Sequence, residues 1–131
     1  MHFQTALATL AALVSLAGAD RLLVDVETKA WDFDNLELSR AYWEAFDGIK
    51  KARYSVDPRN GCQAPPHLPA MRQLCLDWHP DRLRGHFYFH GQGKRCISYK
   101  NNKASEFFPR HPCPVGKSCS TWEITEVPCT W

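Results

Sequence analysis

Three features are missing from this chain of 131 residues: a Cys-x-x-Cys pair, an Asn-x-Ser/Thr site and an apolar run long enough to span a bilayer. Because paired ligand cysteines are absent, we expect no zinc site, no other metal and no cofactor. Because the longest apolar run is too short, we expect no transmembrane segment. N-linked glycosylation is not expected either.

Catalytic and nucleic-acid-binding motifs are absent as well. The sequence contains no nucleophile elbow, no phosphate loop and no His-Glu-x-x-His. No local pattern links the histidines into an acid–base pair. We therefore predict that the protein is not an enzyme, and that nucleic acid is not its partner.

The first nineteen residues resemble a secretory signal. Residues 5–16 form a short apolar run, and Ala17-Gly18-Ala19 supplies the small residues at which such signals are cleaved. We expect residues 1–19 to be removed and the chain to be secreted. The six cysteines then lie in an oxidising compartment, where an even number in a short chain predicts three disulfides.

All the cysteines lie in the last seventy or so residues, so the region before Cys62 must pack by itself or dock onto the cross-linked part. Fifteen connectivities are open to six cysteines. The cysteines are Cys62, Cys75, Cys96, Cys113, Cys119 and Cys129.

Charge is unevenly distributed although the net value is only +2. Glu106 is the one acid between Arg82 and Lys117, and this basic stretch predicts a contact surface for an acidic protein, an anionic glycan or a membrane face. The residues expected to carry the basic surface are Lys94, Arg95, Lys100 and Lys103.

Residues 20–57 are expected to form a helical N-terminal region. A short strand over residues 22–27 is followed by apolar residues at three- and four-residue steps, which predict an amphipathic helix over residues 36–53. The residues of this pattern are Leu38, Tyr42, Ala45, Phe46 and Ile49.

Residues 58–131 are expected to form a disulfide-stabilised domain. Residues 86–90 and 95–99 flank Gly91-Gln92-Gly93 and predict a β-hairpin, and residues 121–127 predict a further strand. The expected fold is therefore small α+β and disulfide-rich, with the N-terminal helix beside a twisted hairpin and one or two further short strands.

The hairpin resembles the central hairpin of Kunitz-type (pancreatic trypsin inhibitor-like) domains. The aromatic triplet Phe87-Tyr88-Phe89, with Cys96 and Tyr99 at the family's spacing, carries this resemblance over about residues 62–119. The family's cysteine in the second binding loop is missing here. The resemblance implies Cys62–Cys119 and Cys96–Cys113 bridges, which leave Cys75 to pair with Cys129.

The same resemblance places the protease-binding residue directly after the second cysteine, at Leu76, and so implies a chymotrypsin- or elastase-like target. Arg82 or Arg84 would instead suit a trypsin-like enzyme. The residues expected on the presented loop are Leu76, Trp78, Arg82 and Arg84.

We therefore predict a secreted, monomeric protein that binds an extracellular protein and inhibits a serine protease, as the Kunitz-like salivary proteins of blood-feeding arthropods do. Two alternatives stay open. One is an effector or toxin whose fold is specific to its lineage. The other is a short lipocalin-like ligand-binding protein, because residues 52–57 are similar to the start of some arthropod lipocalins.

Overall fold

The computed structural model describes residues 20–29, 36–46, 51–103, 113 and 115–131, and all its regular elements there are β-strands. No helix that could cross a membrane occurs among these residues. The strands are β1 (Arg21–Lys29), β2 (Leu36–Phe46), β3 (Lys51–Val56), β4 (Gly61–Gln63), β5 (Met71–Asp77), β6 (Arg84–Phe89), β7 (Arg95–Lys103) and β8 (Lys117–Val127).

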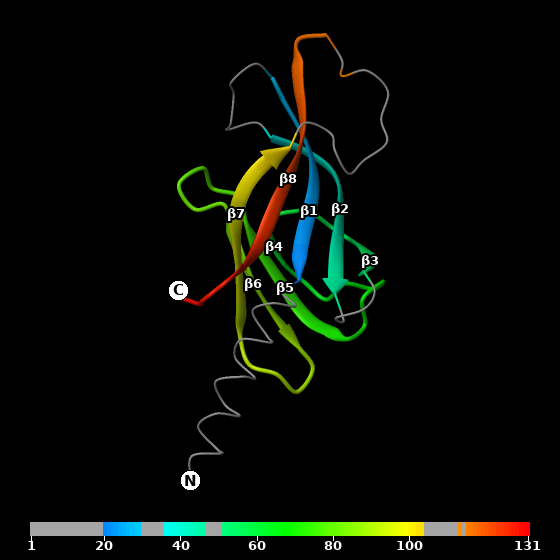
Figure 1. Cartoon of the computed structure of the whole chain (residues 1–131), viewed down its shortest axis with the longest axis vertical. Helices are drawn as coiled ribbons and strands as arrows, with labels where there is room; N and C mark the ends of the chain where they lie inside the picture. Colours follow the sequence, from blue (N-terminus) through cyan, green and yellow to red (C-terminus); the bar gives the residue numbers. More distant parts are fainter. Residues whose placement is uncertain (1–19, 30–35, 47–50, 104–112, 114) are drawn as a thin grey trace.

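The eight strands form one antiparallel sheet in the order β3-β2-β1-β8-β7-β6-β5-β4, which curls into a half-barrel (Figure 1). Most neighbours in the sheet are also neighbours in sequence. The exception is the pair β1 and β8, whose register runs from Arg21 opposite Thr125 to Lys29 opposite Lys117. This ladder joins β1–β3 to β4–β8.

The inner face of the curl is the hydrophobic core. Leu22, Val24 and Val26 alternate along β1 and point inward, as expected for a strand with one apolar face. The Trp43 ring of β2 packs edge-on against the Phe87 ring of β6, with centroids 4.6 Å apart. Because β2 and β6 are not neighbours in the sheet, this contact spans the interior.

The predicted helix over residues 36–53 is wrong, and with it the α+β class. Residues 36–46 form β2, and residues 51–53 begin β3. A bulge explains part of the misleading pattern. Val24 pairs with Ala41 but Val26 pairs with Leu38, so β2 has one extra residue there. Leu38 and Ala45 of the predicted pattern therefore both contact the core although they are seven positions apart, which is the spacing of two helical turns, whereas Tyr42 is not part of the core cluster.

The other predicted elements are strands as expected. β1 contains residues 22–27, β6 and β7 form the predicted hairpin, and β8 contains residues 121–127. The signal segment, residues 1–19, lies outside the described residues.

The disulfide pairing that the Kunitz-type resemblance implied is also wrong. The bridges join Cys62 to Cys75, Cys96 to Cys129 and Cys113 to Cys119. Cys62 and Cys75 are direct cross-strand partners in β4 and β5, and Cys129 ties the C-terminal segment to β7. Each bridge lies in the β4–β8 half, but strand register brings together only Cys62 and Cys75, because Cys113 and Cys129 lie outside the strands.

Gly85 of β6 has no room for a side chain, because a Cβ there would lie 2.6 Å from the carbonyl oxygen of Cys75. Gly85→Ala should therefore lower the free energy of unfolding by about 1–3 kcal/mol, the usual cost of overpacking a core. Gly93→Ala is the control, since its Cβ would meet nothing within 4 Å. Urea denaturation measures both variants, and equal stability of the two would contradict this close packing.

Candidate binding surface on the outer side of the sheet

Two of the four residues expected on the presented loop are buried. Leu76 is the sixth residue of β5 and is 4% exposed, and Trp78 is 6% exposed and packs near Trp122. Neither side chain is available to enter a protease pocket. The exposed part of the predicted loop is its tip, at His79, Pro80, Asp81 and Arg82.

Hydrogen bonds hold the β5–β6 loop, residues 78–83, at its base. The Trp78 indole donates to the carbonyl oxygen of Pro58 at 2.6 Å, and the Trp78 amide donates to the Asn60 side chain at 2.8 Å. At the far end Leu83 has a φ of 42°, which a leucine rarely adopts, and its carbonyl oxygen accepts from the Tyr99 amide. The loop is therefore pinned to the turn at residues 57–60 and to β7.

Asp77 organises the tip of the loop. Its carboxylate accepts from the His79 amide at 3.1 Å and from the Arg82 guanidinium at 2.5 Å. Burial raises the pKa of Asp77, but these two hydrogen bonds, together with the charges of Arg82 and Arg84, outweigh it and hold the pKa below its ordinary value. The Arg82 amide also donates to the His79 carbonyl oxygen, so the tip is closed on itself.

A recess lies beside the base of the loop. It has a volume of about 270 Å³ and is lined by Arg59, Asn60, Gly61, Cys62 and Gln63. Since Asn60 also bonds the Trp78 amide, the recess and the loop share one support. A partner seated on the loop would find this hollow next to it.

A second surface lies on the outer side of β5–β7, and we call it the basic–aromatic face. Arg84 and His86 alternate along β6 with Gly85 and Phe87, which face the core. The Arg72 guanidinium lies 4.7 Å from the centre of the Tyr88 ring, and the Arg84 guanidinium lies 4.5 Å from that of Trp131. The face consists of Arg72, Arg84, His86, Tyr88, Lys94 and Trp131.

His86 sits in the middle of this face, edge-on to Tyr88 at 6.0 Å between ring centres. Burial, followed by the charge of Lys94, lowers the pKa of His86 below its ordinary value. The imidazole is therefore mainly neutral at pH 7. At that pH the positive charge of the face comes from Arg72, Arg84 and Lys94.

The described side chains of the predicted basic surface, those of Lys94, Arg95 and Lys100, do not lie together. Lys94 belongs to the basic–aromatic face, but the Arg95 guanidinium bonds Glu126 at 2.7 and 2.6 Å and stacks over Phe87 in the core. Lys100 reaches Glu123 at 4.0 Å. Lys103 ends β7, and its side chain lies outside the described part.

The opposite half of the outer surface, on β1, β2, β3 and β8, has its cations paired, and we call it the paired face. Glu44 is only 4% exposed and accepts from Arg21 at 2.9 Å and from Arg53 at 3.0 Å. Arg21 also bonds Glu123 at 3.1 Å, and Arg40 reaches Asp25 at 3.5 Å. Here charge holds strands to one another.

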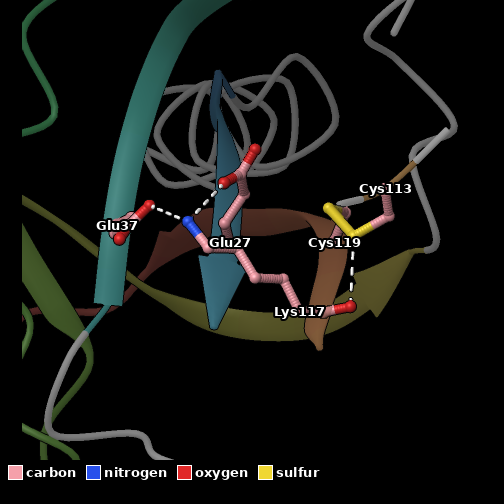
Figure 2. The surroundings of a disulfide bond; sticks show 5 residues. All are labelled: Glu27, Glu37, Cys113, Lys117 and Cys119. Carbon is pink, nitrogen blue, oxygen red and sulfur yellow. Dashed lines mark hydrogen bonds and ion pairs between the residues drawn. A yellow bond between two sulfur atoms is a disulfide. The ribbon is translucent and has the colours of Figure 1, made fainter. Parts of the chain in front are cut away.

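Figure 2 shows the end of the paired face, next to the Cys113–Cys119 bridge. The Lys117 ammonium lies between the carboxylates of Glu37 at 2.8 Å and Glu27 at 3.5 Å. The hydrogen bond to Glu37 is the main cause that raises the pKa of Lys117. This cation therefore links β8 to β1 and β2.

Part of the basic–aromatic face could be predicted from the sequence. The order Arg84-Gly85-His86-Phe87-Tyr88 alternates as a strand does, and this places Arg84, His86 and Tyr88 on one side. Arg72 and Trp131 join them through strand register and the Cys96–Cys129 bridge, for which the sequence carries no signal.

Comparison with protein-family models, with curated proteins and with solved structures gives no match. No cluster of three or more His, Cys, Asp or Glu suited to a metal ion occurs in the described part of the chain. The functional argument therefore rests on the β5–β6 loop and the two outer faces.

Glu44 should make stability depend on acid pH. Burial raises the pKa of Glu44, but the hydrogen bonds from Arg21 and Arg53 outweigh it and lower the pKa overall. The stability it contributes is therefore complete above the unfolded pKa of about 4.3 and is lost as pH falls through the lower folded pKa. Glu44→Gln should flatten this acid slope and cost about 1–3 kcal/mol at pH 7.

Urea denaturation at several pH values measures this effect. Asp81→Asn is the control, because its side chain is 89% exposed and its one ion pair is a 3.8 Å contact with His79. An unchanged acid slope in Glu44→Gln would show that Glu44 is not responsible.

Proposed function

We propose that the protein is a secreted binding protein that engages an extracellular protein through the tip of the β5–β6 loop. The observation that carries this proposal is an exposed loop whose base is held by hydrogen bonds. His79, Pro80, Asp81 and Arg82 project from a base held by Trp78, Asn60 and Asp77. A loop already fixed in its bound shape loses little conformational entropy when it binds.

The target class we propose is a trypsin-like serine protease. Arg82 is the exposed cation at the tip, and such enzymes accept a basic side chain in their specificity pocket. Leu76 is buried in β5, so the chymotrypsin-like target implied by the Kunitz-type resemblance has no supporting residue. The proposal therefore rests on the loop, independently of that family.

A panel of extracellular serine proteases tests this proposal with the intact secreted chain. We expect inhibition of at least one trypsin-like member, and Arg82→Ala should weaken it by about tenfold or more, as expected when an anchor residue is truncated. Lys51→Ala is the control, because Lys51 is also an exposed cation paired with a carboxylate, that of Glu44 at 3.9 Å, and it lies on β3, outside the loop and the recess.

Equal inhibition by the two variants would exclude Arg82 as the contact. If no member of the panel is inhibited, the protease class is wrong.

A second candidate is a lipocalin-like protein that binds a small apolar molecule. The supporting observation is the architecture: eight antiparallel strands, mostly in sequence order, curl around an apolar interior. Eight-stranded sheets of this kind enclose either packed side chains or one small ligand. The Trp43–Phe87 contact across the interior favours packed side chains.

Titration with an apolar fluorescent dye separates these two states of the interior. Saturation at one dye per chain, competed by an unlabelled apolar ligand, would favour the lipocalin-like candidate. We expect no saturable uptake, because the interior aromatic rings already contact one another.

A further inference from the structure

The three cations of the basic–aromatic face differ from those of the paired face in what they contact. In the described part of the chain, no ion pair joins Arg72, Arg84 or Lys94 to an Asp or Glu side chain. Arg72 and Arg84 lie over aromatic rings, and Lys94 donates to the main-chain oxygen of Trp131. Asp77 lies opposite Arg84 in the register, but its carboxylate bonds Arg82.

The cations and rings are spread along the length of β6, with Arg72 on the neighbouring strand β5 and Lys94 in the turn before β7. Arg84 and Tyr88 are four residues apart on β6, so their Cα atoms are about 13 Å apart at strand rise. Arg72 stacks on Tyr88 at one end of this row, and Arg84 stacks on Trp131 at the other. Positive groups and ring faces therefore alternate over a length that suits an extended ligand.

We propose that the basic–aromatic face binds a sulfated glycan chain. Sulfate groups would pair with the guanidinium groups of Arg72 and Arg84 and with the Lys94 ammonium. Sugar rings expose C–H faces that pack on aromatic rings, here those of Tyr88 and Trp131. Because Arg72 and Arg84 have no ion pair to an Asp or Glu side chain, they can bind an anion without first breaking one.

The shape of the surface favours a glycan over an acidic protein. β6 lies between β5 and β7, so a peptide cannot extend the sheet there as an added strand. The face lies on the outer side of the curl, away from the hydrophobic core. A linear polyanion needs only spaced charges and flat rings.

This binding goes beyond the proposed loop function and does not depend on it. Arg82, which carries the loop proposal, bonds Asp77 and is not part of the basic–aromatic face. Loss of protease inhibition in Arg82→Ala would leave glycan binding intact. The two proposals can therefore fail separately.

Calorimetry of the intact chain with size-defined heparin oligosaccharides, at physiological salt, tests the proposal. A variant with Arg72→Ala, Arg84→Ala and Lys94→Ala should bind about tenfold more weakly or worse. The matched control removes the same charge elsewhere, through Lys51→Ala, Arg59→Ala and Lys100→Ala, at side chains that are 62%, 82% and 61% exposed. We expect it to lose less than about threefold, as surface charges outside a site do.

Two further measurements test whether the ligand is a sulfated glycan and whether the aromatic rings contact it. Fully desulfated heparin should not bind, and Tyr88→Leu should weaken binding several-fold without changing the thermal midpoint, because stacking is lost and charge is kept. Equal weakening in the matched control would show attraction to net charge only and would overturn the site. Polyglutamate that binds as tightly as heparin would replace the glycan by an acidic protein partner.

Discussion

The fold depends on the ladder between β1 and β8. The Arg21–Glu123 hydrogen bond within it joins residues 102 positions apart, while the other strand pairs form between neighbours in sequence. The three disulfides cross-link only the β4–β8 half, so no covalent bond holds β1, β2 and β3 in place. These three strands are held instead by backbone pairing, by the apolar side chains of Leu22, Val24 and Val26, and by the ion pairs around Glu44. Bringing the two ends of so long a segment together lowers the entropy of the chain, and the contacts of this ladder must offset that loss.

Local patterns in the sequence predicted the local strands, and failed where the register between strands decides the outcome. The alternation at residues 22–27 and the turn at Gly91-Gln92-Gly93 depend only on adjacent residues, and they correctly predicted β1, β6 and β7. Part of the helical spacing at residues 36–53 arises from a bulge in β2 opposite β1, which is a property of the pairing. Cysteine pairing failed for the same reason, because Cys62 meets Cys75 through the β4–β5 register.

The candidate sites were predictable to a similar extent. Arg82 and Lys94 are exposed as expected, since turns carry polar residues to the surface. Arg95 is an arginine in the same basic stretch, yet its side chain is partly buried, bonded to Glu126 and stacked over two phenylalanine rings. Basic residues near one another in sequence alternate between the two sides of a strand, so a charge run does not define a surface until the strand and its direction are known.

The separation of the two outer faces bears on how such a chain can evolve. Substitutions on the paired face disturb contacts between strands, because each charge there has a structural partner. Substitutions at Arg72, Arg84 or Lys94 leave the described ion pairs untouched. They also leave in place the residues of β6 that face the core, Gly85 and Phe87. Selection can therefore change the specificity of this surface without refolding the protein, so one scaffold can acquire new partners through few mutations.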